Sequence, residues 1–169
     1  MNRIMVIGCP GAGKSVFSRQ LGKITGIEVI HLDNLWWKPD RTTVSREEFD
    51  EKLAAVLKQE TWIIDGDYRR TMEVRMKACD TVIFLDYPPV ICRQGIRERI
   101  GEKRDDLPWI EKEENQQLLE AVNNYASIRR PAVRELLEKY RDRQIMIFRS
   151  RQQAQKWLDD LEKKGNEHV

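Results

Sequence analysis

The sequence predicts an α/β fold in which a five-stranded parallel sheet is flanked by helices. Two observations carry this prediction. Five short apolar runs are near-continuous rather than alternating, as in strands that are buried on both faces of a parallel sheet. Helical patterns separate these runs, and this alternation is typical of α/β folds with right-handed crossovers. The expected strands are Arg3–Ile7, Ile27–Leu32, Thr61–Ile64, Thr81–Leu85 and Gln144–Phe148.

Two helices are expected in the N-terminal third. After the first strand, Phe17, Leu21 and Ile24 recur at helical spacing. Further on, Ser45 and Glu48 form a capping box, in which the serine side chain accepts a hydrogen bond from the backbone N–H three residues later. The apolar positions of this second helix are Phe49, Leu53, Val56 and Leu57.

Two more helices are expected towards the C-terminus. Pro131 marks the start of the first, because proline is favoured in an opening helical turn. Its apolar positions are Val133, Leu136, Leu137 and Tyr140. Ser150 and Gln153 form a second capping box, before Ala154, Trp157, Leu158 and Leu161. The tail Lys163–Val169 is expected to fray.

Composition indicates one soluble domain over residues 1–169. The length suits a single core, and we find no repeat or linker that would divide the chain. Charged residues make up 34% and the net charge is +2, which gives no overall bias toward nucleic acid. No apolar run is long enough to cross a membrane, and the first strand leaves no room for a signal peptide. Cys9, Cys79 and Cys92 form no paired framework, so a cytoplasmic protein is expected.

The stretch GCPGAGKS at residues 8–15 fits the P-loop pattern G-x-x-x-x-G-K-[ST] between a strand and a helix. Its glycines let backbone N–H groups converge on a phosphate, and the helix start adds the positive end of its dipole. Lys14 can bridge two phosphates, and Ser15 can bind Mg²⁺. A plain glycine turn is the alternative, but a chance match in this context is rare. The expected nucleotide-binding residues here are Gly8, Pro10, Gly11, Ala12, Gly13, Lys14, Ser15 and Val16.

The P-loop alone covers GTPases, motor ATPases and small kinases. A GTPase should also carry an NKxD motif, and the sequence has none. The chain is short for a motor ATPase. A small phosphotransferase with a P-loop NTPase fold fits the size.

Five stretches together resemble a known family. They are the P-loop, HLDNLWWKP, WIIDGDYRR, TVIFLDYP and IMIFRSR. WIIDGDYRR is similar to the third strand of nucleoside monophosphate kinases, in which an Asp-Gly pair ends the strand and an arginine follows. Over residues 1 to about 160 the chain resembles the bacterial DNA topology modulation proteins (FlaR-related), within the adenylate-kinase-like P-loop group.

The resemblance implies a nucleoside-monophosphate-kinase-like fold that binds ATP and Mg²⁺. It places an acceptor-binding segment at about residues 33–60 and a short lid at about residues 98–126. Two features depart from adenylate kinase. Asp67-Tyr68-Arg69 stands where those enzymes have Phe-Pro-Arg, and the lid has no zinc-binding cysteines. AMP specificity is therefore left open.

Three acids end or follow apolar strands. Asp65 is expected to orient Mg²⁺ through water and to lie near the substrate, although a turn or cap aspartate is the alternative. Asp86 is a weaker candidate, since a turn role explains it equally well. Asp33 should lie at the carboxyl edge of the sheet, where ligands of such folds bind, and could position the acceptor hydroxyl. His31 is expected to be a core or edge histidine rather than a catalytic one.

Aromatic and basic residues complete the expected acceptor site. Trp36 and Trp37 are adjacent, so on a helix they would point in different directions. One of them could simply pack in the core, but the alternative is that one stacks on the acceptor, and both are expected among the substrate-binding residues. The resemblance implies that Arg69 clamps an acceptor phosphate. Arg129 and Arg130 are expected to close the site from the far side.

A third arginine group is expected at the lid. Arg93 and Arg97 are four apart on a helix that should bury Cys92, Ile96 and Ile100. A solvated face is the default interpretation, whereas the resemblance implies that the two arginines stabilise the transferring phosphoryl group. The stretch Gly101–Asp106 is then a short mobile lid.

The adenine of ATP is expected beside Ser150 and Arg151, just past the last strand, although a helix cap explains Ser150 equally well. Arg149 flanks the same serine. On the resemblance, Arg93 would also contact ATP.

The expected reaction moves the γ-phosphoryl of ATP to a small acceptor such as a nucleotide. The expected catalytic residues are Lys14, Asp33, Arg69, Arg93 and Arg97. The alternative is a nucleotide-binding regulatory module associated with DNA topology that has no turnover. A DNA-binding module needs a continuous basic face, whereas a kinase needs arginines that converge on phosphates. The charges along this sequence are interspersed, which favours the kinase and makes nucleic acid an unlikely direct ligand.

Overall fold

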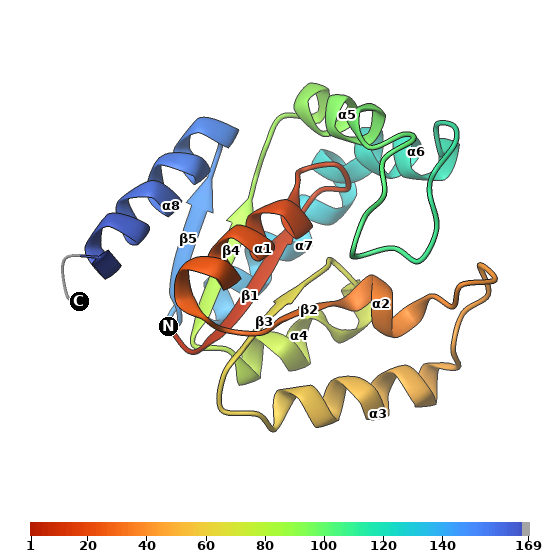
Figure 1. Ribbon diagram of the computed structural model, residues 1–169. Helices are drawn as coiled ribbons and strands as arrows, with labels where there is room; N and C mark the ends of the chain where they lie inside the picture. The colour runs from red at the N-terminus through yellow and green to blue at the C-terminus, as the bar shows by residue number, and fades with distance from the viewer. Residues whose placement is uncertain (167–169) are drawn as a thin grey trace.

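The structure is a computed structural model that describes residues 1–166. Its five strands form one parallel sheet in the order β2-β3-β1-β4-β5 (Figure 1). The predicted α/β fold with a five-stranded parallel sheet is confirmed. The strands are β1 (Arg3–Gly8), β2 (Val29–His31), β3 (Trp62–Asp65), β4 (Thr81–Leu85) and β5 (Gln144–Phe148).

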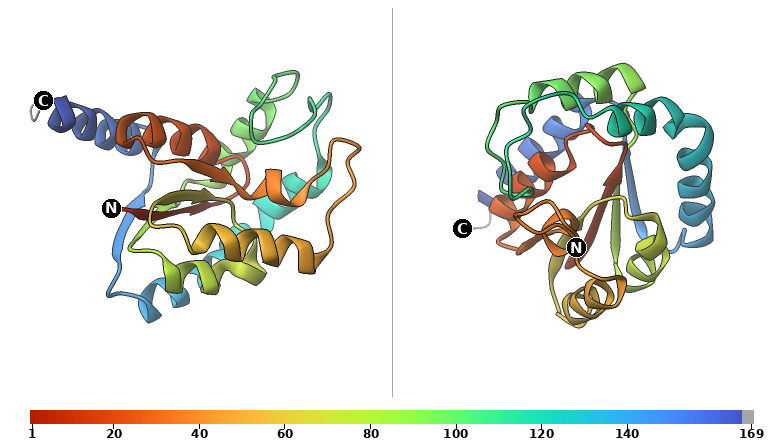
Figure 2. Two further views of the ribbon diagram at one scale, coloured as in Figure 1. Left: turned by 60° about the horizontal axis from the view of Figure 1, so that its bottom comes forward. Right: turned by 90° about the vertical axis from the view of Figure 1, so that its right-hand side faces the viewer.

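Helices cover both faces of the sheet. Helices α1 and α8 pack against each other on one face, while α4 and α7 lie on the other (Figure 2). A five-residue π-helical segment, η1, joins α6 to α7. The bounds are α1 (Lys14–Thr25), α2 (Leu32–Trp36), α3 (Arg46–Leu57), α4 (Arg69–Ala78), α5 (Pro89–Glu98), α6 (Gln116–Asn124), η1 (Tyr125–Arg129), α7 (Arg130–Lys139) and α8 (Arg151–Asn166).

Burial separates the central strands from the edge strands. All residues of β3 and β4 are buried, as is β1 after Arg3. By contrast, every residue of β5 is half-buried or exposed, and Val29 and Ile30 of β2 are half-buried. The expectation that all five strands are buried on both faces is therefore wrong for the two edge strands. Each of them has only one neighbour in the sheet.

Both predicted capping boxes start helices. The Ser45 hydroxyl accepts from the Glu48 N–H at 3.1 Å, and the Ser150 hydroxyl accepts from the Gln153 N–H at 3.2 Å. The expected fraying from Lys163 is wrong as far as Asn166, because α8 continues to that residue. Lysines in its last turn favour this extension, since they oppose the negative end of the helix dipole. The rest of that expected tail lies outside the described residues.

The strand topology places the loops that contain the expected site residues at one edge of the sheet. All five strands are parallel, so the P-loop after β1, the turn after β3 and the turn after β4 share the carboxyl edge. Ligands of open α/β sheets bind at this edge. No helix within residues 1–166 has the length and hydrophobicity needed to span a bilayer.

Candidate active site

The P-loop links β1 directly to α1. Gly13 caps α1 with φ of 91°, in the left-handed region that favours glycine. No side chain bonds to the start of this helix, and its first turn contains no acid. The first N–H groups of α1 therefore lack side-chain caps, and N–H groups of this kind can bind an anion with help from the helix dipole.

Gly11 brings the loop into backbone contact with α5. Its φ is 81°, and a Cβ added there would lie 2.0 Å from the Cys92 carbonyl oxygen. A Cβ added at Gly95 would in turn lie 2.0 Å from the Gly11 carbonyl oxygen. Only glycine fits at either position. The P-loop is thus packed directly on the helix that leads into the expected lid.

The two P-loop side chains expected at the phosphates contact different partners. Lys14 Nζ donates to the carbonyl oxygens of Gly8 at 2.8 Å and Cys9 at 3.1 Å, so the ammonium lies over the loop. Ser15 Oγ donates to Asp106 Oδ2 at 2.8 Å. This bond ties the P-loop to the loop 99–115 that follows α5.

A cavity of about 810 Å³ opens beside the P-loop. Residues of α5 and α8 line it, as do Trp37, Tyr68 and Trp109. The expected site residues that line it are Pro10, Gly11, Ala12, Gly13, Lys14, Ser15, Val16, Asp33, Trp37, Asp65, Arg69, Arg129 and Arg151. Those that do not line it are Gly8, Trp36, Arg93, Arg97, Arg130 and Ser150.

Asp33, at the start of α2, is held by Tyr68. The Tyr68 hydroxyl donates to Asp33 Oδ1 at 2.6 Å. Burial raises the pKa of Asp33 above its ordinary value, although the Tyr68 hydrogen bond opposes this. Tyr68 itself has φ of 24°, a strained backbone of the kind that clusters at functional sites.

A buried arginine fixes the turn that carries Tyr68. Arg75 of α4 donates to the carbonyl oxygens of Gly66 at 2.9 Å and Asp67 at 2.8 Å, and also to that of Tyr68. Burial lowers its pKa to about 10. The guanidinium stays charged at neutral pH and organises three carbonyl groups. It thereby positions Tyr68 against Asp33.

Asp65 pairs with His31 across neighbouring strands. The two residues are in register between β2 and β3, and His31 Nδ1 lies 2.7 Å from Asp65 Oδ2. Burial alone would lower the pKa of His31, but the hydrogen bond and charge of Asp65 raise it above its ordinary value. His31 is buried, as expected, and Asp65 still reaches the cavity.

The two adjacent tryptophans have different surroundings. Trp36 meets the rings of Phe49 at 5.6 Å and Tyr68 at 6.5 Å, beside the core. Trp37 meets Trp109 of the loop 99–115 edge-on, with ring centroids 5.4 Å apart. Trp37 and Trp109 both line the cavity, so they form an aromatic contact between the acceptor segment and the expected lid.

The structure does not bring Arg93 and Arg97 to the cavity. Arg93 donates to Asn123 at 2.8 Å, and Arg97, which is 62% exposed, pairs with Glu114. Cys92 and Ile96 take the buried face of α5, so the residues that follow each of them point away. Ile100, expected on the buried face, is half-buried.

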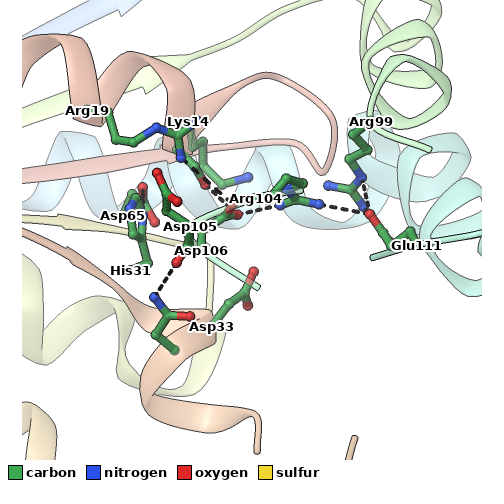
Figure 3. Close-up of polar contacts among 12 residues, drawn as sticks. Lys14, Arg19, His31, Asp33, Asp65, Arg99, Arg104, Asp105, Asp106 and Glu111 are labelled. Atoms are coloured by element: carbon green, nitrogen blue, oxygen red, sulfur yellow. Dashed lines mark hydrogen bonds and ion pairs between the residues drawn. The ribbon is translucent and has the colours of Figure 1, made fainter. Parts of the chain in front are cut away.

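Arg99 and Arg104 line the cavity instead. Both pair with Glu111, with N–O distances of 2.9 and 2.8 Å. Arg104 also binds Asp106, with Nε 3.1 Å from Oδ1. Figure 3 shows these four side chains in one row. Arg99 and Arg104 lie beyond the end of α5, so no helical spacing in the sequence indicates that they share a site. The only signal in the sequence is the charged run Glu102–Asp106.

The same loop is tied to the rest of the site by further contacts. Asp106 is only 2% exposed. Burial would raise its pKa, but the Arg104 ion pair and the Ser15 hydrogen bond hold the pKa below its ordinary value. Next to it, the Asp105 carbonyl oxygen accepts from Asn34 Nδ2 at 2.8 Å (Figure 3). The loop thus bridges the P-loop and α2.

Arg129 and Arg130, both expected to close the site from its far side, have different surroundings. Arg129 lines the cavity and lies 3.5 Å from the Asp67 carboxylate. Arg130 instead donates two hydrogen bonds to Asp86, at 2.8 and 2.7 Å. Arg134 and Arg149 also contact Asp86, at 3.5 and 3.4 Å. Asp86 is therefore an ion-pair centre outside the cavity.

The residues present fit Mg²⁺ that arrives with a nucleotide. Within the described part of the chain, no group of three His, Cys, Asp or Glu side chains could hold a metal ion by itself. Ser15 and the carboxylates of Asp33, Asp65 and Asp106 all line the cavity. These oxygen ligands suit Mg²⁺, which commonly keeps waters and phosphate oxygens in its shell.

The parallel sheet and the P-loop define a P-loop NTPase fold. The chain is similar to the 1.7 Å crystal structure of shikimate kinase from Bacteroides thetaiotaomicron, with a TM-score of 0.57 and 21% identity over 96% of this chain and 97% of that one. It is also similar to shikimate kinase from Acinetobacter baumannii in complex with shikimate, with a TM-score of 0.60 and 17% identity over 97% and 94% of the two chains.

At these identities the likeness establishes the fold. No family model matches the chain, and no curated protein matches it. The predicted kinase-like P-loop fold is confirmed. The narrower resemblance to DNA topology modulation proteins stays a prediction.

Proposed function

We propose that this protein is an ATP-dependent kinase that moves the γ-phosphoryl group of ATP to a small acceptor such as a nucleotide. One observation carries the proposal. The uncapped start of α1, with Lys14, opens onto the same cavity of about 810 Å³ as the half-buried carboxylate Asp33. A phosphate-binding end and a hydroxyl-binding end in one cavity are what phosphoryl transfer between two ligands requires.

The P-loop end would hold ATP. Backbone N–H groups at the start of α1 bind the phosphates, and Lys14 turns from its two carbonyl partners toward the β- and γ-phosphates. Ser15 would hold Mg²⁺ directly and Asp65 would do so through water. When bound, Mg²⁺ neutralises charge on the transferring group. Arg151 lies at the α8 end of the cavity, where the adenine is expected.

The other end would hold the acceptor. Asp33 accepts a proton from the attacking hydroxyl or orients it, and its raised pKa makes it a better base than an exposed aspartate. Arg69 and Arg129 would bind an anionic group of the acceptor, since both line the cavity. Trp37 offers a flat surface for a ring.

The arginines that neutralise the transferring phosphoryl group would be Arg99 and Arg104 rather than Arg93 and Arg97. The first pair lines the cavity, and the second pair contacts Asn123 and Glu114 outside it. Closure of the loop 99–115 would exclude water and so limit ATP hydrolysis.

The mixed charge of the cavity weighs against direct DNA binding, which the alternative, a nucleotide-binding regulatory module associated with DNA topology that has no turnover, could involve. Asp33, Asp65 and Asp106 line the cavity together with basic residues such as Lys14 and Arg99. The lining is therefore not the continuous basic face that a DNA-binding site needs. The matched shikimate kinases also favour a kinase by fold.

A phosphoryl-transfer screen tests the proposal. The protein is incubated with Mg²⁺ and ATP and with nucleoside monophosphates, nucleosides or hydroxy acids, shikimate included, and ADP release is followed. We expect one class to raise ADP release well above the rate with ATP alone. A protein that binds ATP but transfers phosphate to none of these classes would contradict it.

A further inference from the structure

The hydroxyl expected to bind Mg²⁺ already meets a carboxylate from a distant part of the chain. Ser15 Oγ and Asp106 Oδ2 lie 2.8 Å apart, although 91 residues separate them in sequence. Asp106 is buried, and Arg104 donates to both of its carboxylate oxygens, including the one that accepts from Ser15 (Figure 3). The loop 99–115 therefore presents a fixed, charged oxygen ligand to Ser15.

The spacing of these two oxygens suits one magnesium shell. Mg²⁺ binds oxygen at about 2.0–2.1 Å in an octahedron, so two neighbouring ligands lie about 2.9 Å apart. The observed 2.8 Å is close to that value. Mg²⁺ would take the place of the serine proton between the two oxygens, and it would share Asp106 Oδ2 with the Arg104 guanidinium.

The contacts of Asp106 do not resemble those of a group that blocks the phosphate site. Its partners are the side chains of Ser15, Arg104 and, at 3.9 Å, Arg19. No backbone N–H of the P-loop donates to Asp106 among the hydrogen bonds of residues 1–166. The N–H groups that would bind phosphate are thus left to the nucleotide.

We propose that Asp106 is a magnesium ligand that the loop 99–115 delivers to Ser15, with Arg104 as its positioning residue. The inference rests on the proposed function, because Mg²⁺ would arrive with ATP. It adds that the metal holds the loop closed, since one ligand comes from the P-loop and another from the loop. Without metal, the two parts are joined by the Ser15–Asp106 hydrogen bond alone among the described residues.

The test compares Asp106→Asn with Asp105→Asn. Both variants remove one negative charge from the same loop, but the Asp105 side chain is exposed. The probes are Mn²⁺, which replaces Mg²⁺, and a non-hydrolysable ATP analogue. Electron paramagnetic resonance in ¹⁷O-enriched water counts the water molecules on bound Mn²⁺, and a titration gives its affinity.

We expect Asp106→Asn to gain one Mn²⁺-bound water and to bind Mn²⁺ at least about 10-fold more weakly in the nucleotide complex. Asp105→Asn should match the wild type in both measurements. The analogue should bind all three proteins equally in EDTA, which verifies that the P-loop is intact. An amide that still ligates Mn²⁺ would hide the change in water count, so Asp106→Ala is measured as well.

Unchanged water counts in both Asp106 variants would overturn the inference. So would tighter binding of the Mn²⁺–nucleotide complex by Asp106→Asn, because that result would make Asp106 an inhibitory plug. If the wild type binds no nucleotide at all, the proposed function itself fails, and this outcome is distinct from the other two.

Discussion

The Tyr68 hydroxyl donates a 2.6 Å hydrogen bond to Asp33, which joins the turn after β3 to the start of α2. Arg75 holds that turn through three carbonyl groups, so the position of the Asp33 carboxylate depends on a buried structural arginine. The expected acceptor site is therefore built on rigid elements rather than on loop residues alone.

Replacing Asp33 by Asn should lower phosphoryl transfer by on the order of 10²–10⁴-fold, because general-base catalysis contributes about that much. In the wild type, burial raises the pKa of Asp33, so the rate should fall with acid at a pH above the ordinary aspartate pKa of about 3.9. Tyr68→Phe should move this acid limb to still higher pH, because the hydrogen bond to the carboxylate is lost. A profile that is unchanged in Tyr68→Phe would contradict the assignment.

Asp33→Asn should also raise the stability of the folded protein at neutral pH. A carboxyl group whose pKa is raised on folding binds its proton more tightly in the native state, so stability falls as the pH rises from the unfolded pKa to the folded one. Above the folded pKa, the full cost of ionising the Asp33 carboxyl in the folded protein remains. Asp33→Asn should therefore have a higher free energy of unfolding than the wild type at pH 7, and the two should converge in acid. Urea unfolding at several pH values measures this difference.

Arg104→Ala and Arg97→Ala form a matched pair in and beside the lid loop. Arg104 lines the cavity, whereas Arg97 is largely exposed. Because Arg104 carries a charge at the cavity and also holds Asp106, its loss in Arg104→Ala should slow transfer by on the order of 10²-fold. Arg97→Ala should change the rate little, because surface ion pairs contribute little. Equal losses in both variants would restore the role that the sequence suggested for Arg97.

Gly95→Ala tests the contact between α5 and the P-loop. Alanine in a helix interior is normally favoured over glycine by about 1 kcal/mol. Here the added Cβ would lie 2.0 Å from the Gly11 carbonyl oxygen, so we expect a loss of about 1–3 kcal/mol and weaker ATP binding. Gly165→Ala on α8 is the control, since no atom lies within 4 Å of its added Cβ. A stabilised Gly95→Ala that binds ATP normally would contradict the contact.

Tryptophan emission should report closure over two ligands. Trp37 and Trp109 meet between the acceptor segment and the loop 99–115, so their surroundings should change when ATP and acceptor bind together. The shift should exceed the sum of the two single-ligand shifts, because closure couples the sites. Trp109→Phe should remove most of it, while Trp62, fully buried in β3, should not respond. A strictly additive response would argue against coupled closure.

Local chemistry explains how far the sequence could predict this structure. The P-loop, the five strands and the serine caps at Ser45 and Ser150 are set by short-range patterns, and all of them were predicted. The burial of β5 was not, because an apolar run does not reveal whether a strand lies at the edge of the sheet.

The expected site was predicted only in part for a related reason. Lys14 and Asp33 follow strands, so the parallel sheet brings them to one edge. Arg99, Arg104 and Asp106 lie in a loop with no periodicity, and their positions depend on long-range ion pairs with Glu111 and Ser15. Helical spacing drew attention to Arg93 and Arg97 instead.

The most direct test of phosphoryl transfer at the P-loop follows labelled phosphate from [γ-³²P]ATP to the best acceptor of the screen, with wild-type protein and Lys14→Met. Lys14 contacts only loop carbonyl oxygens within the described structure, so the variant should fold and unfold like the wild type. We predict label in the acceptor with the wild type and a rate lower by on the order of 10²-fold or more with Lys14→Met. Equal transfer rates in the two proteins would contradict a P-loop kinase.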